Sequence, residues 1–331
     1  MTTTAVEERY RIAPQLRHYE QNEPYLRPYL TFTARPNLRT PVFSTDAEGY
    51  RLSASPGGVV DSASWLAGGG GGLVVGGSWT FGVGATADAA TLPSQLAFLT
   101  GTPQLNLGIC TSNSLQNLIS AIPFLEAATT IVYCSNATTL LTSLQTLGLN
   151  DVYGPIRFES MLAALGAGAL AEMVQRALSR ASDWTTKLQI PRGTRTSAEA
   201  DEAELDARLE DALRRMLRDL RMLWRCRPPG ARVLCCLQPF ADPTARDFTP
   251  EERELHDLNA ERRGAGTGLR KFVLSRWDAY RRRLEADCAA QGIPFLDLPA
   301  ASFAGWSFMD EWHMTDAGYR QAAERIAGAL S

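Results

Sequence analysis

Composition and charge describe an ordinary globular chain. It has 331 residues, of which 45% are apolar and 21% charged, as in typical soluble domains. The formal net charge of −3 excludes the strongly basic character of nucleic-acid-binding proteins. No segment approaches the ~18 consecutive apolar residues of a membrane span, and the N-terminus has no secretory signal pattern. The six cysteines lack CxxC or His-paired metal spacing, so we expect free, buried thiols and a cytoplasmic location.

Residues 1–70 are predicted to form an N-terminal extension with short β strands. Residues 25–33 have β-type side chains and a proline, which favours an edge strand. Residues 48–52 are predicted to form a second short strand. The five consecutive glycines at 68–72 are interpreted as a flexible connection. A phosphate-binding loop is disfavoured there, because neither a GxxxxGK[ST] nor a correctly spaced GxGxxG motif accompanies them.

Residues 71–331 are predicted to form a three-layer α/β/α sandwich around a mostly parallel, five-stranded sheet. Five apolar segments read as strands: 73–75, 105–109, 130–134, 232–237 and 293–296. Helical patterns at 92–99, 115–125 and 272–290 lie between strands, and a closing helix is predicted at 316–330. Strands that alternate with helices in this way are typical of βαβ units.

A helical insertion is expected at about residues 155–226. Residues 155–190 read as helical, and Thr196 with Glu199 forms a capping box that opens a long helix to about Cys226. The apolar residues of that helix recur every three or four positions, which favours packing on its own domain over binding a partner helix. The polar segment 242–268 is interpreted as a surface excursion in preference to a mobile lid.

Ser78 is the first candidate for chemistry, because it follows an apolar strand and two glycines. In open α/β sheets, ligands bind at the carboxyl ends of the strands. A serine hydroxyl needs an adjacent base, which His313 can supply if a carboxylate such as Asp310 holds its other ring nitrogen. The other two histidines, His18 and His256, lie in polar or charged segments. We therefore predict a nucleophilic triad of Ser78, His313 and Asp310.

These segments resemble the SGNH (GDSL-type) hydrolases over about residues 72–330. Residues 74–82, VVGGSWTFG, are similar to the family's first block, Gly-Asp-Ser-x-Thr-x-Gly, and residues 106–108, NLG, are similar to the second block. Residues 310–319, DEWHMTDAGY, match the fifth block. The resemblance implies a three-layer α/β/α fold, ester or thioester chemistry, and no metal or organic cofactor.

Two departures from the family pattern affect the expected oxyanion hole. Gly77 replaces the aspartate of the first block, and the third block, Gly-x-Asn, aligns with Asn136 and Thr138. The resemblance implies that the amides of Ser78 and Gly108 donate to the oxyanion. The side-chain donor is lost, replaced by the Thr138 hydroxyl, or supplied by Asn136. Loss of one such donor costs about 10²–10³ in turnover.

Three residues near these blocks are candidates for substrate binding. Trp79 and Trp312 flank the catalytic blocks, where they line an acyl pocket or pack in the core. Asn113 is favoured as a loop hydrogen-bonder over a substrate contact.

Three functions follow from these features. The first is an esterase, thioesterase or deacylase that acts on a small-molecule or carrier-bound acyl substrate. The second is an acyltransferase that passes the acyl group to an alcohol or amine, and the third is a catalytically impaired binding protein. The altered first and third blocks motivate the latter two, whereas Ser78, Asp310 and His313 favour the first.

Overall fold

The computed structural model describes eight stretches of the chain: residues 3–22, 25–27, 30–135, 140–141, 144, 201–241, 246–263 and 267–331. The helices predicted at 155–190 and the capping box of Thr196 and Glu199 lie outside these residues.

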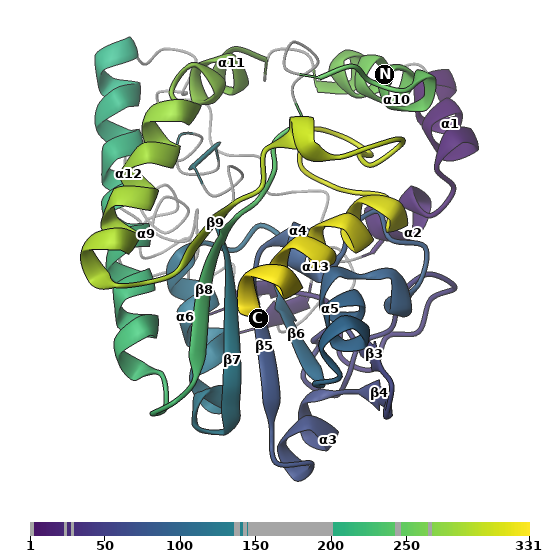
Figure 1. Ribbon diagram of the computed structural model, residues 1–331. Coiled ribbons are helices and arrows are strands. Elements are labelled where there is room, and N and C mark those ends of the chain that lie inside the picture. Colours follow the sequence, from purple (N-terminus) through teal and green to yellow (C-terminus); the bar gives the residue numbers. More distant parts are fainter. Residues whose placement is uncertain are drawn as a thin grey trace, which may run out of the picture.

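A five-stranded parallel sheet forms the centre of the molecule (Figure 1). Its strands are β5 (Gly71–Gly76), β6 (Gln104–Gly108), β7 (Ala128–Ser135), β8 (Arg232–Leu237) and β9 (Phe295–Asp297). They lie in the order β6-β5-β7-β8-β9, and every neighbouring pair is parallel. The five predicted strands are confirmed, with shifts of a few residues at their ends.

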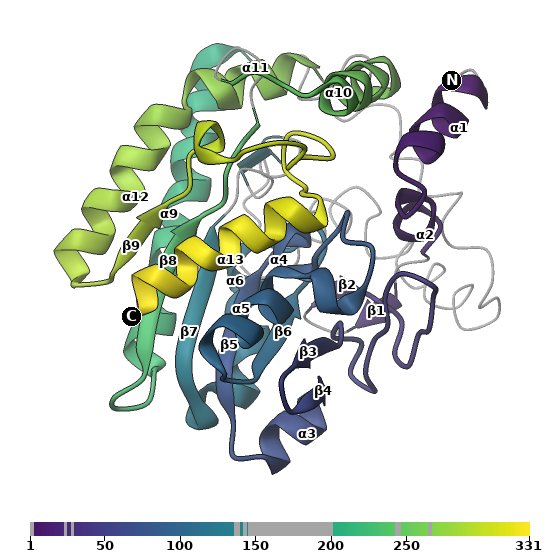
Figure 2. The ribbon, with the colours of Figure 1, turned by 45° about the vertical axis from the view of Figure 1, so that its right-hand side comes forward.

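Helices cover both faces of this sheet. On one face, α5 (Leu92–Thr100) and α13 (Asp316–Leu330) pack against side chains such as Val74 and Val132. On the other face, α6 (Ser114–Ala121), α9 (Glu202–Cys226) and α12 (Trp277–Gln291) pack against Leu73 and Val75. Apolar residues on both sides of a strand are expected where a parallel sheet is buried on both faces. The predicted three-layer α/β/α fold is therefore confirmed (Figure 2).

The ends of several helices differ from the predictions. α6 stops at Ala121 and a 3-10 helix, η2 (Ile122–Ala127), follows, with Pro123 in its first turn. The helix predicted at 272–290 is divided at Arg276 into α11 (Thr267–Ser275) and α12. α9 begins at Glu202, because Asp201 is extended and its carboxylate accepts a hydrogen bond from the Glu204 amide. The apolar stripe of α9 is buried in the core of its own domain, as predicted.

The glycines at 70–72 are packed, and our interpretation of them as part of a flexible connection is wrong. Gly68 ends α3 (Ser62–Ala67), and β5 begins three residues later at Gly71. A Cβ atom on Gly70 would lie 2.0 Å from the Ala127 carbonyl oxygen, and one on Gly72 would lie 1.9 Å from the Gln104 side chain. These glycines are therefore needed because neighbouring atoms approach the backbone closely.

In its described residues, the N-terminal extension contains three helices and two antiparallel hairpins. The helices are α1 (Thr3–Ile12), α2 (Leu16–Glu20) and α3. The predicted strand at 25–33 is a hairpin of β1 (Tyr25–Arg27) and β2 (Thr31–Thr33). Residues 48–52 do not form a strand. Residues 47–49 turn there, Arg51 makes an isolated bridge with Thr45, and the hairpin of β3 (Ser53–Ser55) and β4 (Gly58–Val60) follows.

The charged segment 242–268 contains a packed helix, α10 (Pro250–Arg263), which lies beside α1 (Figure 2). Leu255 is fully buried in a cluster with Ala13, Leu16 and Met309, and Arg11 of α1 forms an ion pair with Glu254 at 3.2 Å. The described part of this segment therefore supports neither a mobile lid nor a simple excursion, because it is a structural element with its own core contacts.

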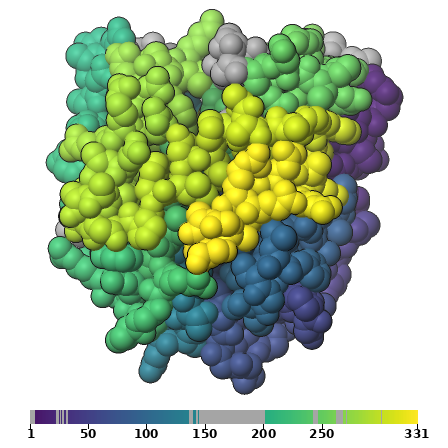
Figure 3. Space-filling view, in the orientation of Figure 1, coloured from purple at the N-terminus to yellow at the C-terminus, as the bar shows by residue number. Residues whose placement is uncertain are grey.

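In the space-filling view, the yellow C-terminal segment crosses one face between the green and the blue parts of the chain (Figure 3). Among the helices that the structure describes, none combines the length and the apolar character needed to cross a membrane.

All six cysteines are free, and they differ in exposure. Cys226 is exposed and Cys110 is half-buried, whereas Cys134, Cys235, Cys236 and Cys288 are buried. Burial raises the pKa of Cys134 to about 12. The thiolate is the reactive form, so these buried thiols stay protonated and inert at pH 8. We expect brief iodoacetamide treatment of the native protein to alkylate Cys226 first, as read by peptide mass, and all six cysteines in denaturant. Equal labelling of Cys134 and Cys226 in the native protein would contradict this.

Candidate active site

Ser78 is the first residue of a one-turn helix, α4 (Ser78–Phe81), directly after β5. Gly77 is extended and precedes the helix, and Gly82, with φ of 93°, ends it. A Cβ atom on Gly76 would lie 2.3 Å from Thr80 Oγ1, so only glycine lets α4 pack this closely on the end of the strand. The segment GGSWTFG thus folds as strand, sharp turn and helix, and places Ser78 at the carboxyl edge of the sheet.

The structure brings Ser78, His313 and Asp310 together. Ser78 Oγ lies 2.8 Å from His313 Nε2, and His313 Nδ1 lies 2.8 Å from Asp310 Oδ2. The side chains of His313 and Asp310 are only 18% and 12% exposed. When Nδ1–H donates to the carboxylate, Nε2 is left to accept the serine hydroxyl proton. This is the geometry that a base-activated serine requires.

The Asp310 carboxylate also builds the turn that carries the histidine. Its Oδ1 accepts hydrogen bonds from the amides of Trp312, at 2.8 Å, and His313, at 2.9 Å. The Met309 amide donates to the His313 carbonyl at 2.8 Å. One carboxylate oxygen therefore binds the backbone of the turn and the other binds the imidazole. This explains how Asp310 can contact the His313 ring from only three residues away.

α10 supports this turn from outside. Glu252 is buried, and its Oε1 accepts hydrogen bonds from the amides of Ser307, at 2.9 Å, and Phe308, at 3.0 Å. Its Oε2 accepts from Arg246 at 3.0 Å. Asn259 Nδ2 donates to the Met309 carbonyl at 3.3 Å. Sequence reasoning missed Glu252 because it is one of several acidic residues in a polar helix, and only the folded structure shows its burial.

Replacing Glu252 with Gln is expected to lower the free energy of unfolding by about 3 kcal/mol, because it leaves Arg246 without its buried partner. Urea denaturation monitored by circular dichroism would measure the loss. The control is Glu254→Gln on the same helix, whose ion pair with Arg11 is exposed and is expected to contribute at most about 1 kcal/mol. Equal destabilisation by the two changes would contradict a special role for Glu252.

The structure does not support the Gly108 amide as an oxyanion donor. That amide donates to Asn106 Oδ1 at 2.9 Å in the buried interior. A Cβ atom on Gly108 would lie 2.0 Å from the Phe81 amide nitrogen, so the glycine is needed to make room for α4. The Ser78 amide, at the first position of α4, has no partner in an i→i−4 pattern and stays a candidate donor. Asn136 and Thr138 lie outside the described residues.

The three candidate substrate-binding residues have structural roles. Trp79 is 1% exposed and packs against Tyr319 in the core. Trp312 is 6% exposed, with its ring 4.6 Å from that of Phe240. Asn113 caps α6, since its side chain accepts from the Gln116 amide at 2.9 Å. Of the two roles expected for these tryptophans, their burial against other aromatic rings favours core packing over lining an acyl pocket.

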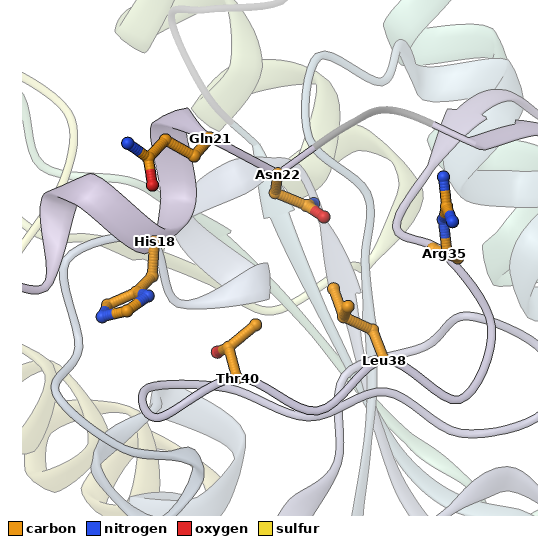
Figure 4. Close-up of a pocket in the computed structure, with 6 residues that line it drawn as sticks. All are labelled: His18, Gln21, Asn22, Arg35, Leu38 and Thr40. Atoms are coloured by element: carbon orange, nitrogen blue, oxygen red, sulfur yellow. The ribbon is translucent and has the colours of Figure 1, made fainter. Parts of the chain in front are cut away.

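A polar hollow lies within the N-terminal extension (Figure 4). It has a volume of about 270 Å³ and is lined by His18, Gln21, Asn22, Arg35, Leu38 and Thr40. None of the predicted site residues that the structure describes lines it. Elsewhere in the described parts of the chain, no group of three or more His, Cys, Asp and Glu side chains is arranged to hold a metal ion.

Comparisons with known proteins give only distant structural matches. No family model and no curated protein matches the sequence. A structure described as a GDSL-like lipase from Bacteroides ovatus ATCC 8483 is 11% identical over 79% of this chain and 52% of its own, with a TM-score of 0.39. A family two carbohydrate esterase from Clostridium thermocellum, solved with cellohexaose, is 11% identical over 78% of this chain and 62% of its own, with a TM-score of 0.36. The chain thus spans little more than half the length of these two proteins, and similarity at this level carries no conclusion about activity.

The evidence for the expected fold is the arrangement of the sheet and of the segments that end at it. The serine follows β5, the histidine and aspartate precede α13, and both ends meet at one edge of a five-stranded parallel sheet between two helical layers. This is the arrangement that the sequence blocks imply. The chain therefore has the three-layer fold that its resemblance to the SGNH hydrolases implies.

Proposed function

We propose that this chain is a serine hydrolase that cleaves an ester or thioester through an acyl-enzyme on Ser78. The observation that carries the proposal is the hydrogen-bonded series from Ser78 Oγ to His313 and on to Asp310, with 2.8 Å at each step. His313 takes the hydroxyl proton as Ser78 attacks the acyl carbonyl, and later returns a proton to the leaving group. Water then attacks the acyl-enzyme, releases the acid and regenerates Ser78.

The test is the intact-protein mass after exposure to a fluorophosphonate, followed by peptide mapping. We expect one adduct on Ser78 in the wild-type protein and none in Ser78→Ala. The absence of any adduct on folded wild-type protein, with acyl esters of several chain lengths also left intact, would overturn the proposal and favour the binding-protein alternative.

Transfer to an alcohol or amine is the second form that the same acyl-enzyme allows. It is supported by the altered first block and by the occupied Gly108 amide, which leaves fewer donors than the family pattern implies. Product analysis with an activated ester, in the presence and absence of glycerol or a primary amine, separates the two. Acid as the sole product at every acceptor concentration favours hydrolysis.

We also propose a cytoplasmic location, because the structure has six unpaired cysteines and reducing compartments keep thiols in that state. Thiol titration of denatured protein isolated without reductant should then give six free thiols. Fewer than six would oppose this location.

A further inference from the structure

The side chain of Arg51 connects the N-terminal extension to the helix that carries Ser78. Its guanidinium is fully buried, with 0% of the side chain exposed. Nη1 donates to the Gly82 carbonyl at 2.8 Å and to the Phe81 carbonyl at 3.2 Å. These two carbonyls mark the end of α4, and Ser78 is at its beginning.

Other groups fix the guanidinium in place. Its Nε donates to Asp88 Oδ1 at 2.8 Å, its Nη1 to the Tyr19 hydroxyl at 2.8 Å and its Nη2 to the Val42 carbonyl at 3.2 Å. The Tyr19 hydroxyl in turn donates to the Ala85 carbonyl at 2.6 Å. The rings of Tyr19, Phe43 and Phe81 surround the cation, with centroids 5.5–5.6 Å from its central carbon.

A helix of one turn cannot maintain its own geometry. Helix nucleation is unfavourable, so a short helix depends on contacts from outside. The last carbonyls of a helix have no partner within it, and leaving a buried acceptor unpaired is costly. A cation at that end also complements the helix dipole. Arg51 supplies the charge at this end of α4. It shares the donor role with the Tyr19 hydroxyl, which lies 3.0 Å from the Gly82 carbonyl oxygen, and with Asn106 Nδ2, which donates to the Phe81 carbonyl at 3.4 Å. Arg51 therefore helps to hold the end of α4 in place.

We propose that Arg51 is a positioning residue that sets the place of Ser78 relative to His313. The two residues are on segments 235 positions apart, and each segment has its own support: Arg51 for α4, and Glu252 with Asn259 for the histidine turn. Near-attack geometry tolerates little error, since a displacement of about 1 Å can cost 10²-fold in rate. The N-terminal extension is thereby a working part of the site. The kinetic side of this inference rests on the proposed function.

The test compares Arg51→Met and Arg51→Lys with a matched control, Arg9→Met. Arg9 is also a buried arginine of the extension, but its ion pair is with Glu20, at 2.8 Å. Two quantities are measured on the full-length protein: the fluorophosphonate labelling rate per folded molecule, and amide hydrogen exchange of residues 76–85. We expect Arg51→Met to label about 10-fold more slowly or worse and to exchange faster at 78–85. Arg51→Lys should lie between Arg51→Met and wild type, and Arg9→Met should change neither quantity.

The pH dependence of labelling separates positioning from a general loss of structure. The His313–Asp310 contact is independent of Arg51, so the midpoint of the labelling profile should stay at its wild-type value while the plateau falls. If Arg51→Met does not fold, Tyr19→Phe and Asp88→Asn test the same network by removing one support each, with about 3-fold slower labelling expected.

This inference would be overturned if the folded Arg51 variants showed wild-type labelling and wild-type exchange, and the proposed function would be left intact. If the Arg51 variants do not fold, the same result in Tyr19→Phe and Asp88→Asn would overturn it. A wild-type protein that takes no label would overturn the proposed function, while hydrogen exchange would still decide whether Arg51 holds α4.

Discussion

Replacing either Ser78 or His313 with Ala is expected to lower kcat/KM for an activated acyl ester by about 10⁶, with little further loss when both are replaced. The reason is that the two side chains act as one unit, joined at 2.8 Å. A serine without its base is a weak nucleophile, and a base without its serine has no acyl acceptor to activate. Initial rates with a p-nitrophenyl ester would give the three values, alongside melting temperatures to show that each variant is folded.

The two remaining histidines are the controls for this experiment. His256 is on α10, where its Nδ1 lies 3.4 Å from Asp257 Oδ1. His18 lines the polar hollow of the extension (Figure 4). Neither is bonded to Ser78, so His18→Ala and His256→Ala should retain most of the activity. If the fold-losses in kcat/KM of Ser78→Ala and His313→Ala multiply in the double variant, the two residues act independently. That result would contradict the triad.

Asp310→Asn is expected to lower kcat by about 10⁴, by analogy of geometry with other serine triads. Asparagine can still accept the Trp312 and His313 amide hydrogen bonds with its carbonyl oxygen, so the turn should survive. Its NH₂ group, however, faces His313 Nδ1 and favours the tautomer that carries its proton on Nε2. That tautomer cannot accept the Ser78 proton. Steady-state kinetics of the folded variant would measure the effect.

Asp316→Asn is the matched control. Asp316 lies three residues after His313, whereas Asp310 lies three residues before it, and both changes remove one carboxylate. Asp316 accepts a hydrogen bond from the Thr86 amide at 2.8 Å, away from the imidazole. We expect a small change in melting temperature and an activity close to wild type. An Asp310→Asn variant within 10-fold of wild type would show that this carboxylate does not set the tautomer.

The parts that sequence reasoning could reach are those encoded by local pattern. Strands such as β7 and β8 are short apolar runs bounded by polar loops, and α13 begins at the residue after a capping threonine, Thr315. The positions of Ser78, Asp310 and His313 followed from their blocks. Local sequence patterns were therefore enough to predict the sheet, the helices that cover it and the three candidate catalytic residues.

The parts that it missed depend on which distant segments meet. Trp79 has the same sequence context whether it faces a pocket or Tyr319, and only the packing of α13 decides. The glycines at 70–72 resemble a linker until Ala127 and Gln104 are placed against them. Arg51 and Glu252 are charged residues in polar segments, and such residues are mostly exposed. Their burial is a tertiary property without a signature in sequence.

The separation of 235 residues between Ser78 and His313 has a consequence for how the protein acquires its reactivity. Closing a loop of that length costs about 5 kcal/mol of chain entropy by the (3/2)RT ln n relation, and contacts of this kind form late in folding. During synthesis, β5 and Ser78 emerge before the histidine turn and α13. A nascent or truncated chain would carry the serine without its base. Ser78 would therefore stay unreactive until the whole sheet is assembled.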